Sequence, residues 1–192
     1  MKRQLNREMA AWLDSQVKET AHRALISNDP REIFRHAMIA CVGIREKGGN
    51  NRGHMVELIQ DTLGTADGEP WCMSLVQTCL AFAELRSGHA SPIAASEHCL
   101  TVWHDTPKEQ RVQTVPAPGA IIIWQHGAGP SGHTGCTISA VVDGRFHAVE
   151  GNTESGLVAA GQVERDGGGC YETIRTVNGA GSMKVVGYLK PF

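Results

Sequence analysis

Hydrophobic positions divide the chain into a helical first part and a strand-rich last part. Residues 3–25 are predicted to form a helix because apolar residues recur there at helical spacing, at Leu5, Met9, Trp12, Leu13 and Val17. A second helix is predicted from Pro30 towards Gly43, with Asp29 as N-cap and Glu32 closing a capping box. Further helices are predicted within NNRGHMVELIQDTLG, over residues 70–86 and, as a short one, over residues 92–103.

The helix of residues 70–86 is predicted to be amphipathic. Its apolar residues fall on one face, namely Leu75, Val76, Cys79, Leu80 and Ala83. A face of this kind is expected to pack on the rest of the domain.

From Pro116 onward the pattern changes to β-branched runs separated by turn residues. The predicted strands are AIIIW, TISAVV, RFHAVE, CYETIRTV and KVVGYL. Asp143 and Gly144 predict a two-residue hairpin turn, and GNTESGLVAAG and RDGGG are predicted to be mobile loops. Helices first and strands last indicate an α+β fold with an antiparallel sheet, rather than alternating βαβ units.

Length, composition and charge narrow the class of protein. The chain has 192 residues, 41% of them hydrophobic, and a net charge of −2, which is typical of a globular domain. Lysine and arginine are scattered, so we expect no nucleic-acid partner, and no apolar run is long enough to insert in a membrane. The first residues lack the apolar segment of a secretory signal, so we expect synthesis in the cytoplasm without a signal peptide.

Six widely spaced cysteines indicate reduced thiols rather than a disulfide framework. Cys72 differs from the others because it follows Pro70 and Trp71 on the first turn of a predicted helix. Unpaired N–H groups and the helix dipole stabilise a thiolate at such a position. Cys72 is therefore either a candidate nucleophile or a small residue in a helix–sheet contact.

A cysteine nucleophile needs a base, and His133 in SGHTGCTISAVV is the best candidate because it starts a predicted strand behind glycines. With a two-residue turn at Asp143, His133 would lie opposite Glu154 and share a face with Asn152 and Glu150. A bulge or a longer loop would shift this pairing. The sequence thus predicts the face of a third group but leaves its distance open.

Metal sites are a competing use of cysteine and histidine. His133 and Cys136 form one close pair without the matching second pair that zinc sites usually show. Asp67 and Glu69 lack the alternating oxygen ligands of a calcium loop. We expect no metal and no cofactor.

The chain resembles the CHAP family, the cysteine amidohydrolases and peptidases of the papain-like and NlpC/P60 superfamily that cleave peptidoglycan. The resemblance runs from Ile44 to Phe192 and follows the family order in REKGGNNRG, GEPWCMSLV, PAPGAIIIW, GHTG, EGNTESG and VVGYLKPF. It implies a papain-like fold, in which residues 44–192 are the hydrolase domain and residues 1–43 are a helical extension. Ala120 departs from the family pattern, which often has aspartate after Pro118 and Gly119.

The resemblance also implies roles for single residues. Cys72 matches the family nucleophile, and His133 matches its base. Glu150 and Asn152 match the acid and amide that complete the site, with Glu150 orienting His133, which favours the shifted strand pairing. The backbone N–H of Cys72 is expected in the oxyanion hole. Trp71 and Trp124 are candidate walls of the substrate pocket, with a place in the core as the alternative.

The resemblance thus implies a peptidoglycan hydrolase that cleaves an amide of the peptide stem, the cross-bridge or the muramoyl-alanine link. We expect a monomeric phage endolysin or other lytic effector, released to the wall by a holin-type partner or a secretion machine, in the latter case with an immunity protein. Two alternatives are a papain-like toxin acting on a protein, such as a deamidase or a transglutaminase-like enzyme, and a non-catalytic module of the same fold.

Overall fold

A computed structural model describes residues 2–154, 168–179 and 182–192. The helices are α1 (Arg7–Ser27), α2 (Pro30–Ala40), α3 (His54–Asp61), α4 (Cys72–Ser87) and α5 (Cys99–Asp105), with a short 3-10 helix over Lys108–Gln110. The strands are β1 (Arg111–Val112), β2 (Ile121–His126), β3 (Gly132–Thr137), β4 (Arg145–Thr153), β5 (Gly169–Thr176) and β6 (Met183–Leu189). The predicted α+β class is confirmed. The predicted loop GNTESGLVAAG lies largely outside the described residues, as do the first residues of RDGGG.

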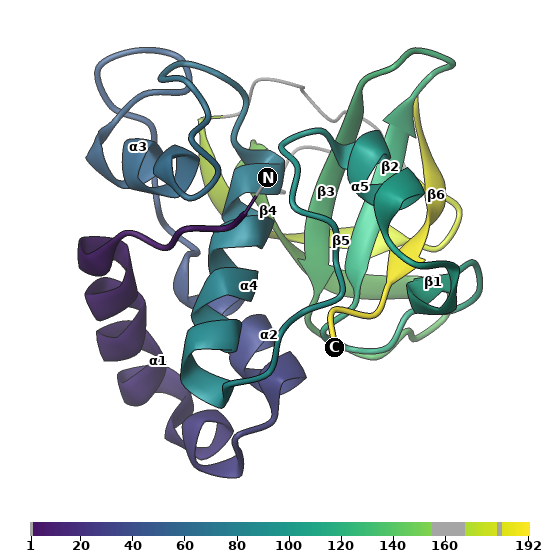
Figure 1. The fold of residues 1–192 in the computed structure, drawn as a ribbon. Coiled ribbons are helices and arrows are strands. Elements are labelled where there is room, and N and C mark those ends of the chain that lie inside the picture. Colours follow the sequence, from purple (N-terminus) through teal and green to yellow (C-terminus); the bar gives the residue numbers. More distant parts are fainter. Residues whose placement is uncertain (1, 155–167, 180–181) are drawn as a thin grey trace.

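The strands form one antiparallel sheet in the order β1-β6-β2-β3-β4-β5. Helix α4 lies between the other N-terminal helices and the sheet, and α5 lies over β2 and β3 (Figure 1). Alternate residues of β2 enter two cores: Ile121 and Ile123 pack towards the helices, whereas Ile122 and Trp124 pack on the opposite face of the sheet. This central strand is therefore buried on both faces, which explains its unbroken apolar run.

Helix α4 is buried all round from Cys72 to Ala83 rather than on one face, so its predicted amphipathic pattern is wrong. Its buried residues include Met73, Thr78 and Phe82 as well as the predicted face. The reason is its central position, because α2 covers one side of α4 and the strands β3 and β4 cover another.

Several helix boundaries differ from the predicted ones. Helix α1 begins at Arg7, since Asn6 is the N-cap and its side chain accepts a hydrogen bond from the Glu8 N–H. Helix α2 begins as predicted, because the Asp29 carboxylate accepts hydrogen bonds from Arg31 and Glu32. Helix α5 begins only at Cys99, and residues 88–98 form a loop without helix or strand.

The β3–β4 hairpin has the predicted turn but a different register. Val142 and Arg145 exchange backbone hydrogen bonds around Asp143 and Gly144, as a two-residue turn requires. Before the turn, residues 139–141 leave the strand pairing, so the predicted strand TISAVV is wrong and β3 ends at Thr137. As a result Cys136 pairs with Val149, where an unbroken hairpin would pair it with Gly151.

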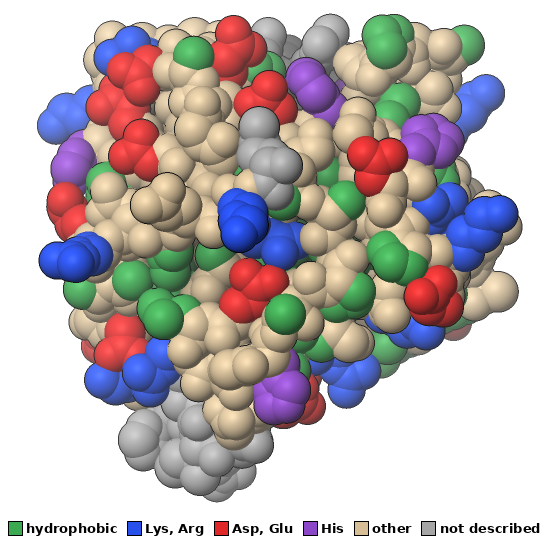
Figure 2. Space-filling model, viewed as in Figure 1, with side chains coloured by type: hydrophobic (Ala, Val, Ile, Leu, Met, Phe, Trp, Pro, Cys, Tyr) green, Lys and Arg blue, Asp and Glu red, His purple; other side chains and the backbone are tan. Residues whose placement is uncertain are grey.

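No helix in the described parts of the chain has the length and hydrophobicity needed to cross a bilayer. On the face shown in Figure 2, basic and acidic side chains are interspersed rather than separated by sign.

Candidate active site

Cys72 is the first residue of α4, where backbone N–H groups have no partner inside the helix. Trp71 precedes it as N-cap, with φ −116° and ψ 10°, so the chain turns into the helix directly behind Pro70. The residue is 7% exposed and borders a cavity. Cys72 therefore has a buried backbone and a thiol that opens onto a cavity at a helix N-terminus.

The register shift of the β3–β4 hairpin brings His133 to Glu150. The imidazole Nε2–H of His133 donates to Glu150 Oε2 at 3.0 Å, and both side chains are almost wholly buried. The exposed Glu154, which the unshifted register would place opposite His133, is not its partner. The second ring nitrogen, Nδ1, is not used by Glu150, and Cys72 borders the same cavity as His133.

Gly135 makes the His133–Glu150 contact sterically possible. A Cβ atom at Gly135 would lie 2.6 Å from Glu150 Cγ and 2.7 Å from the Val149 carbonyl oxygen. Both distances are shorter than real Cβ contacts, so the Glu150 side chain occupies the space that glycine leaves free.

Two residues that the sequence analysis missed hold the Glu150 carboxylate from strand β5. The Arg175 guanidinium donates to both carboxylate oxygens, each at 2.6 Å, and the Thr173 hydroxyl donates to Oε1 at 2.5 Å. Thr173 and Arg175 are two positions apart, so they share one face of the strand. The sequence does show an arginine on a predicted strand next to β4. Only the β4–β5 register, however, reveals that this arginine lies beside Glu150.

Asn152 borders the same cavity as Cys72 and His133. It is 1% exposed and has a φ of 52°, in the left-handed region, at an irregularity in the β4–β5 pairing. Its side-chain Oδ1 is buried without a hydrogen-bond partner among the described residues. The structure thus brings together Cys72, His133, Glu150 and Asn152, with Glu150 rather than Asn152 bonded to His133.

Trp71 and Trp124 belong to the core, so the expectation that they wall the substrate pocket does not fit this structure. Both are fully buried, and neither borders the cavity at Cys72. Trp71 Nε1 donates to Glu46 Oε1 at 2.9 Å. Trp124 stacks on the His133 ring, with centroids 5.7 Å apart and planes at 23°, so it fixes the ring orientation from behind.

A second thiol that the sequence analysis did not single out lies beside the candidate nucleophile. Cys99 is the first residue of α5, and its Sγ lies 4.0 Å from Cys72 Sγ. Glu97, His98 and His126 also border this cavity. All six cysteines are free, as expected, and four of them lie in the core away from this cavity.

The electrostatics of the site favour a thiolate on Cys72. A hydrogen bond from Cys99 is the main cause that lowers the pKa of Cys72 well below its usual range; burial opposes it, and His133 and the Met73 N–H reinforce it. The pKa of Cys99 is correspondingly raised by its hydrogen bond to Cys72. Of the two thiols, Cys72 is therefore the one that ionises.

His133 and Glu150 are held in their charged forms. Burial alone would lower the pKa of His133, but the hydrogen bonds and charges of Cys72 and Glu150 raise it to about 9. Burial likewise opposes ionisation of Glu150, yet His133 and Arg175 bring its pKa down to about 2. These shifts favour the imidazolium form of His133 and the carboxylate form of Glu150 at neutral pH, and the lowered pKa of Cys72 favours its thiolate.

Among the described residues, no three His, Cys, Asp or Glu side chains are arranged as metal ligands. The donor set of the site is instead that of acyl transfer, with a thiolate next to an imidazole that a carboxylate orients.

Comparison of the sequence with known proteins identifies a family that matches the part of the chain containing the site. The family model of the CHAP domain matches residues 64–152, a stretch that contains Cys72, His133, Glu150 and Asn152. No curated protein and no solved structure matched the chain. The match begins after α3 and ends in β4, so Arg175 and Thr173 lie outside it.

A CHAP domain supports a hydrolase of the amidase or peptidase type with peptidoglycan as its substrate class. The five helices and the six-stranded antiparallel sheet are consistent with a papain-like fold. The resemblance to the CHAP family is therefore confirmed over residues 64–152, the stretch that the family model of the CHAP domain matches.

Proposed function

We propose that this protein hydrolyses an amide bond of peptidoglycan, with Cys72 as nucleophile, His133 as general base and acid, and Glu150 as the group that orients His133. The observation that carries the proposal is the position of His133, which borders the same cavity as Cys72 and donates to Glu150 at 3.0 Å. A buried imidazole between a thiol at a helix N-terminus and a carboxylate is the arrangement that thiol-dependent acyl transfer requires.

In the first step the Cys72 thiolate attacks the carbonyl carbon of the amide. The S–C bond forms, and the tetrahedral intermediate collapses with loss of the C–N bond. The leaving nitrogen takes the proton from the imidazolium of His133 and departs as an amine. The acyl part of the substrate remains on Cys72 as a thioester.

In the second step a water molecule gives a proton to His133 and attacks the thioester carbon. The C–S bond breaks, the carboxylic acid product leaves, and the thiolate–imidazolium pair is restored. In both steps the carbonyl oxygen gains charge, and the backbone N–H of Cys72 at the start of α4 is the proposed donor to it. Asn152 borders the same cavity and is the proposed assisting amide.

The proposed role is lytic, as a phage endolysin or another effector that reaches the wall of a bacterium. Cutting amide bonds in the stem, the cross-bridge or the muramoyl-alanine link removes covalent connections on which the wall depends. The described cavity walls are rich in imidazole and carry one carboxylate, on Glu97, which suits a substrate that offers hydrogen bonds.

The test is mass spectrometry of purified peptidoglycan after incubation with the wild type, Cys72→Ala and Cys136→Ala. Cys136 is the matched control, since it is a buried core thiol whose pKa is raised by burial. New fragments are expected with the wild type and Cys136→Ala but not with Cys72→Ala, and their termini identify the bond. Intact walls of both Gram classes, together with a reactive Cys72, would overturn the proposal in favour of a protein substrate.

A further inference from the structure

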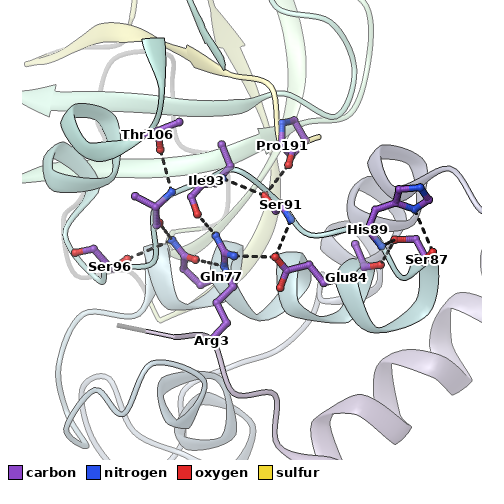
Figure 3. Close-up of polar contacts among 12 residues, drawn as sticks. Arg3, Gln77, Glu84, Ser87, His89, Ser91, Ile93, Ser96, Thr106 and Pro191 are labelled. Atoms are coloured by element: carbon purple, nitrogen blue, oxygen red, sulfur yellow. Dashed lines mark hydrogen bonds and ion pairs between the residues drawn. The ribbon is translucent and has the colours of Figure 1, made fainter. Parts of the chain in front are cut away.

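Arg3 is a buried cation far from Cys72 in the sequence, and its contacts lead towards the cavity. It lies ahead of α1, and its side chain is only 7% exposed. Its Nε donates to Gln77 Oε1 at 2.5 Å, its Nη1 to Glu84 Oε1 at 2.9 Å, and its Nη2 to the Ile93 carbonyl (Figure 3). One guanidinium thus connects two side chains of α4 with the loop of residues 88–98.

The two α4 side chains bound by Arg3 hold the same loop at two places. Gln77 Nε2 donates to the carbonyl oxygens of Ala94, at 2.9 Å, and Ser96, at 3.4 Å. Glu84 Oε1 accepts the Ser91 N–H at 2.8 Å. Since this loop forms neither helix nor strand, such side-chain bonds fix its course.

Other groups hold the remaining backbone of the loop. The Thr106 hydroxyl accepts the Ala94 N–H at 3.1 Å, and the Ser91 hydroxyl donates to the Pro191 carbonyl at 2.6 Å (Figure 3). The loop of residues 88–98 is therefore bonded on two sides. Arg3, Gln77 and Glu84 hold it from the side of the helices, and Thr106 and Pro191 hold it from the other side.

The loop leads directly into one wall of the catalytic cavity. Glu97, His98 and Cys99 follow Ser96 and all border the cavity. Cys99 Sγ lies 4.0 Å from Cys72 Sγ, and Thr65 fixes the Glu97 carboxylate at 2.8 Å. A displacement of residues 93–96 would move this wall relative to Cys72.

We propose that Arg3 and Gln77 are positioning residues for the reaction: they fix the loop of residues 88–98 and so place Glu97, His98 and Cys99 opposite Cys72. Arg3 comes from the segment that precedes α1, outside the stretch that matches the CHAP domain. Residues 1–43 thereby contribute to the catalytic cavity without touching the substrate. The kinetic consequences rest on the proposed function, whereas the placement of Cys99 beside Cys72 does not.

The experiment compares Arg3→Lys, Gln77→Leu and their double variant with the wild type. Arg3→Lys keeps a positive charge beside Glu84 but cannot reach three partners at once, and Gln77→Leu keeps the side-chain bulk without the hydrogen bonds. Arg86→Ala is the matched control, because Arg86 joins α4 to α1 through Asp14, at 3.4 Å, and is not bonded to the loop in the described part of the chain. Folding is checked by circular dichroism, and two readouts follow: the rate of Cys72 alkylation by iodoacetamide against pH, and kcat and KM on peptidoglycan fragments.

Both single variants are expected to lower kcat/KM about tenfold, mainly through KM, since a wall displaced by a fraction of an ångström weakens substrate placement. The pH midpoint of Cys72 alkylation is expected to rise, because Cys99 no longer donates from the same position. The kcat/KM of the double variant should be no lower than that of the more impaired single variant, because two residues of one hydrogen-bond network act together.

Folded variants with wild-type KM and a wild-type alkylation profile would overturn the proposal, as would the same changes in Arg86→Ala. If the wild type cleaves no peptidoglycan, the proposed function fails, and the alkylation profile alone still decides whether Arg3 and Gln77 position the wall.

Discussion

Glu150 is the residue on which most bonds of the candidate site converge. It is fully buried and accepts hydrogen bonds from His133, Thr173 and Arg175. Because its pKa is about 2, it keeps its charge throughout the range in which an enzyme of this kind works. A permanent negative charge behind His133 fixes the ring and stabilises the imidazolium.

Glu150→Gln tests this role, since it keeps the shape of the side chain and removes the charge. We expect kcat/KM on peptidoglycan fragments to fall by about 10²–10⁴, as for other triads in which the orienting acid is replaced by its amide. The pKa of His133, followed by NMR, should fall below 9 because one of the causes that raise it is lost. Glu154→Gln, at an exposed carboxylate near the end of the same strand, should change neither quantity.

The pH dependence of stability and cleavage follows from the raised pKa of His133. The pKa of His133 is raised from 6.5 to about 9, so its contribution to folding stability is fully present below pH 6.5 and is lost as the pH rises through about 9. Amide cleavage should fall over the same alkaline range, because the leaving amine needs the imidazolium proton.

Urea unfolding of the wild type and Cys72→Ala at a series of pH values measures the contribution of His133 to the free energy of unfolding. The alkaline loss should begin at lower pH in Cys72→Ala, since Cys72 is one of the two partners that raise the pKa of His133. An identical alkaline limb in both proteins would show that Cys72 and His133 are not coupled.

At the scale of elements, the β3–β4 hairpin decides which acid reaches His133. The sequence predicted the turn at Asp143 and the face on which the partner lies, and both are confirmed. It could not predict the distance, because the departure of residues 139–141 from the strand pairing involves side-chain bonds within the hairpin, such as the Ser139 hydroxyl that accepts the His147 N–H at 2.9 Å. The family resemblance favoured the shifted pairing, and the structure has it.

Gly135→Ala tests whether the close approach of β3 and β4 keeps Glu150 in place. The new Cβ would meet Glu150 Cγ at 2.6 Å and a backbone oxygen at 2.7 Å, so the strand or the carboxylate must shift. We expect a loss of about 1–3 kcal/mol in the free energy of unfolding and a large loss of cleavage. Gly168→Ala is the control, since its Cβ would meet nothing within 4 Å; equal effects of both would contradict the steric explanation.

The strand β5 shows where prediction from sequence ends. Their spacing of two residues places Thr173 and Arg175 on one face of the strand. The sequence CYETIRTV does not reveal, however, that this face contacts a buried carboxylate. Cys99 was overlooked for a related reason, because the predicted helix began at residue 92 and placed it mid-helix rather than at the start of α5. Local pattern gave element type and face, whereas contacts between distant segments assembled the site.

Across the whole molecule, the N-terminal helices and the site share one core. Met9 and Leu13 of α1 and Phe34 of α2 are fully buried in the same cluster as Leu75 of α4 and its N-cap residue Trp71. The Arg3 network adds polar bonds between this part and the cavity wall (Figure 3). We therefore propose that residues 1–43 fold as part of the hydrolase domain and do not form a separable extension.

Leu13→Ala tests that proposal, because it removes a fully buried side chain from α1 without touching any residue of the site. A cavity in a shared core should cost about 2–5 kcal/mol of the free energy of unfolding. Urea unfolding is followed both by tryptophan fluorescence and by the alkylation rate of Cys136, a thiol buried in β3. If α1 and the sheet unfold as one unit, both midpoints shift together in Leu13→Ala and neither shifts in Ser15→Ala, at an exposed position of the same helix. A fluorescence midpoint that falls while Cys136 keeps its wild-type protection would instead mean that α1 unfolds independently of the hydrolase core.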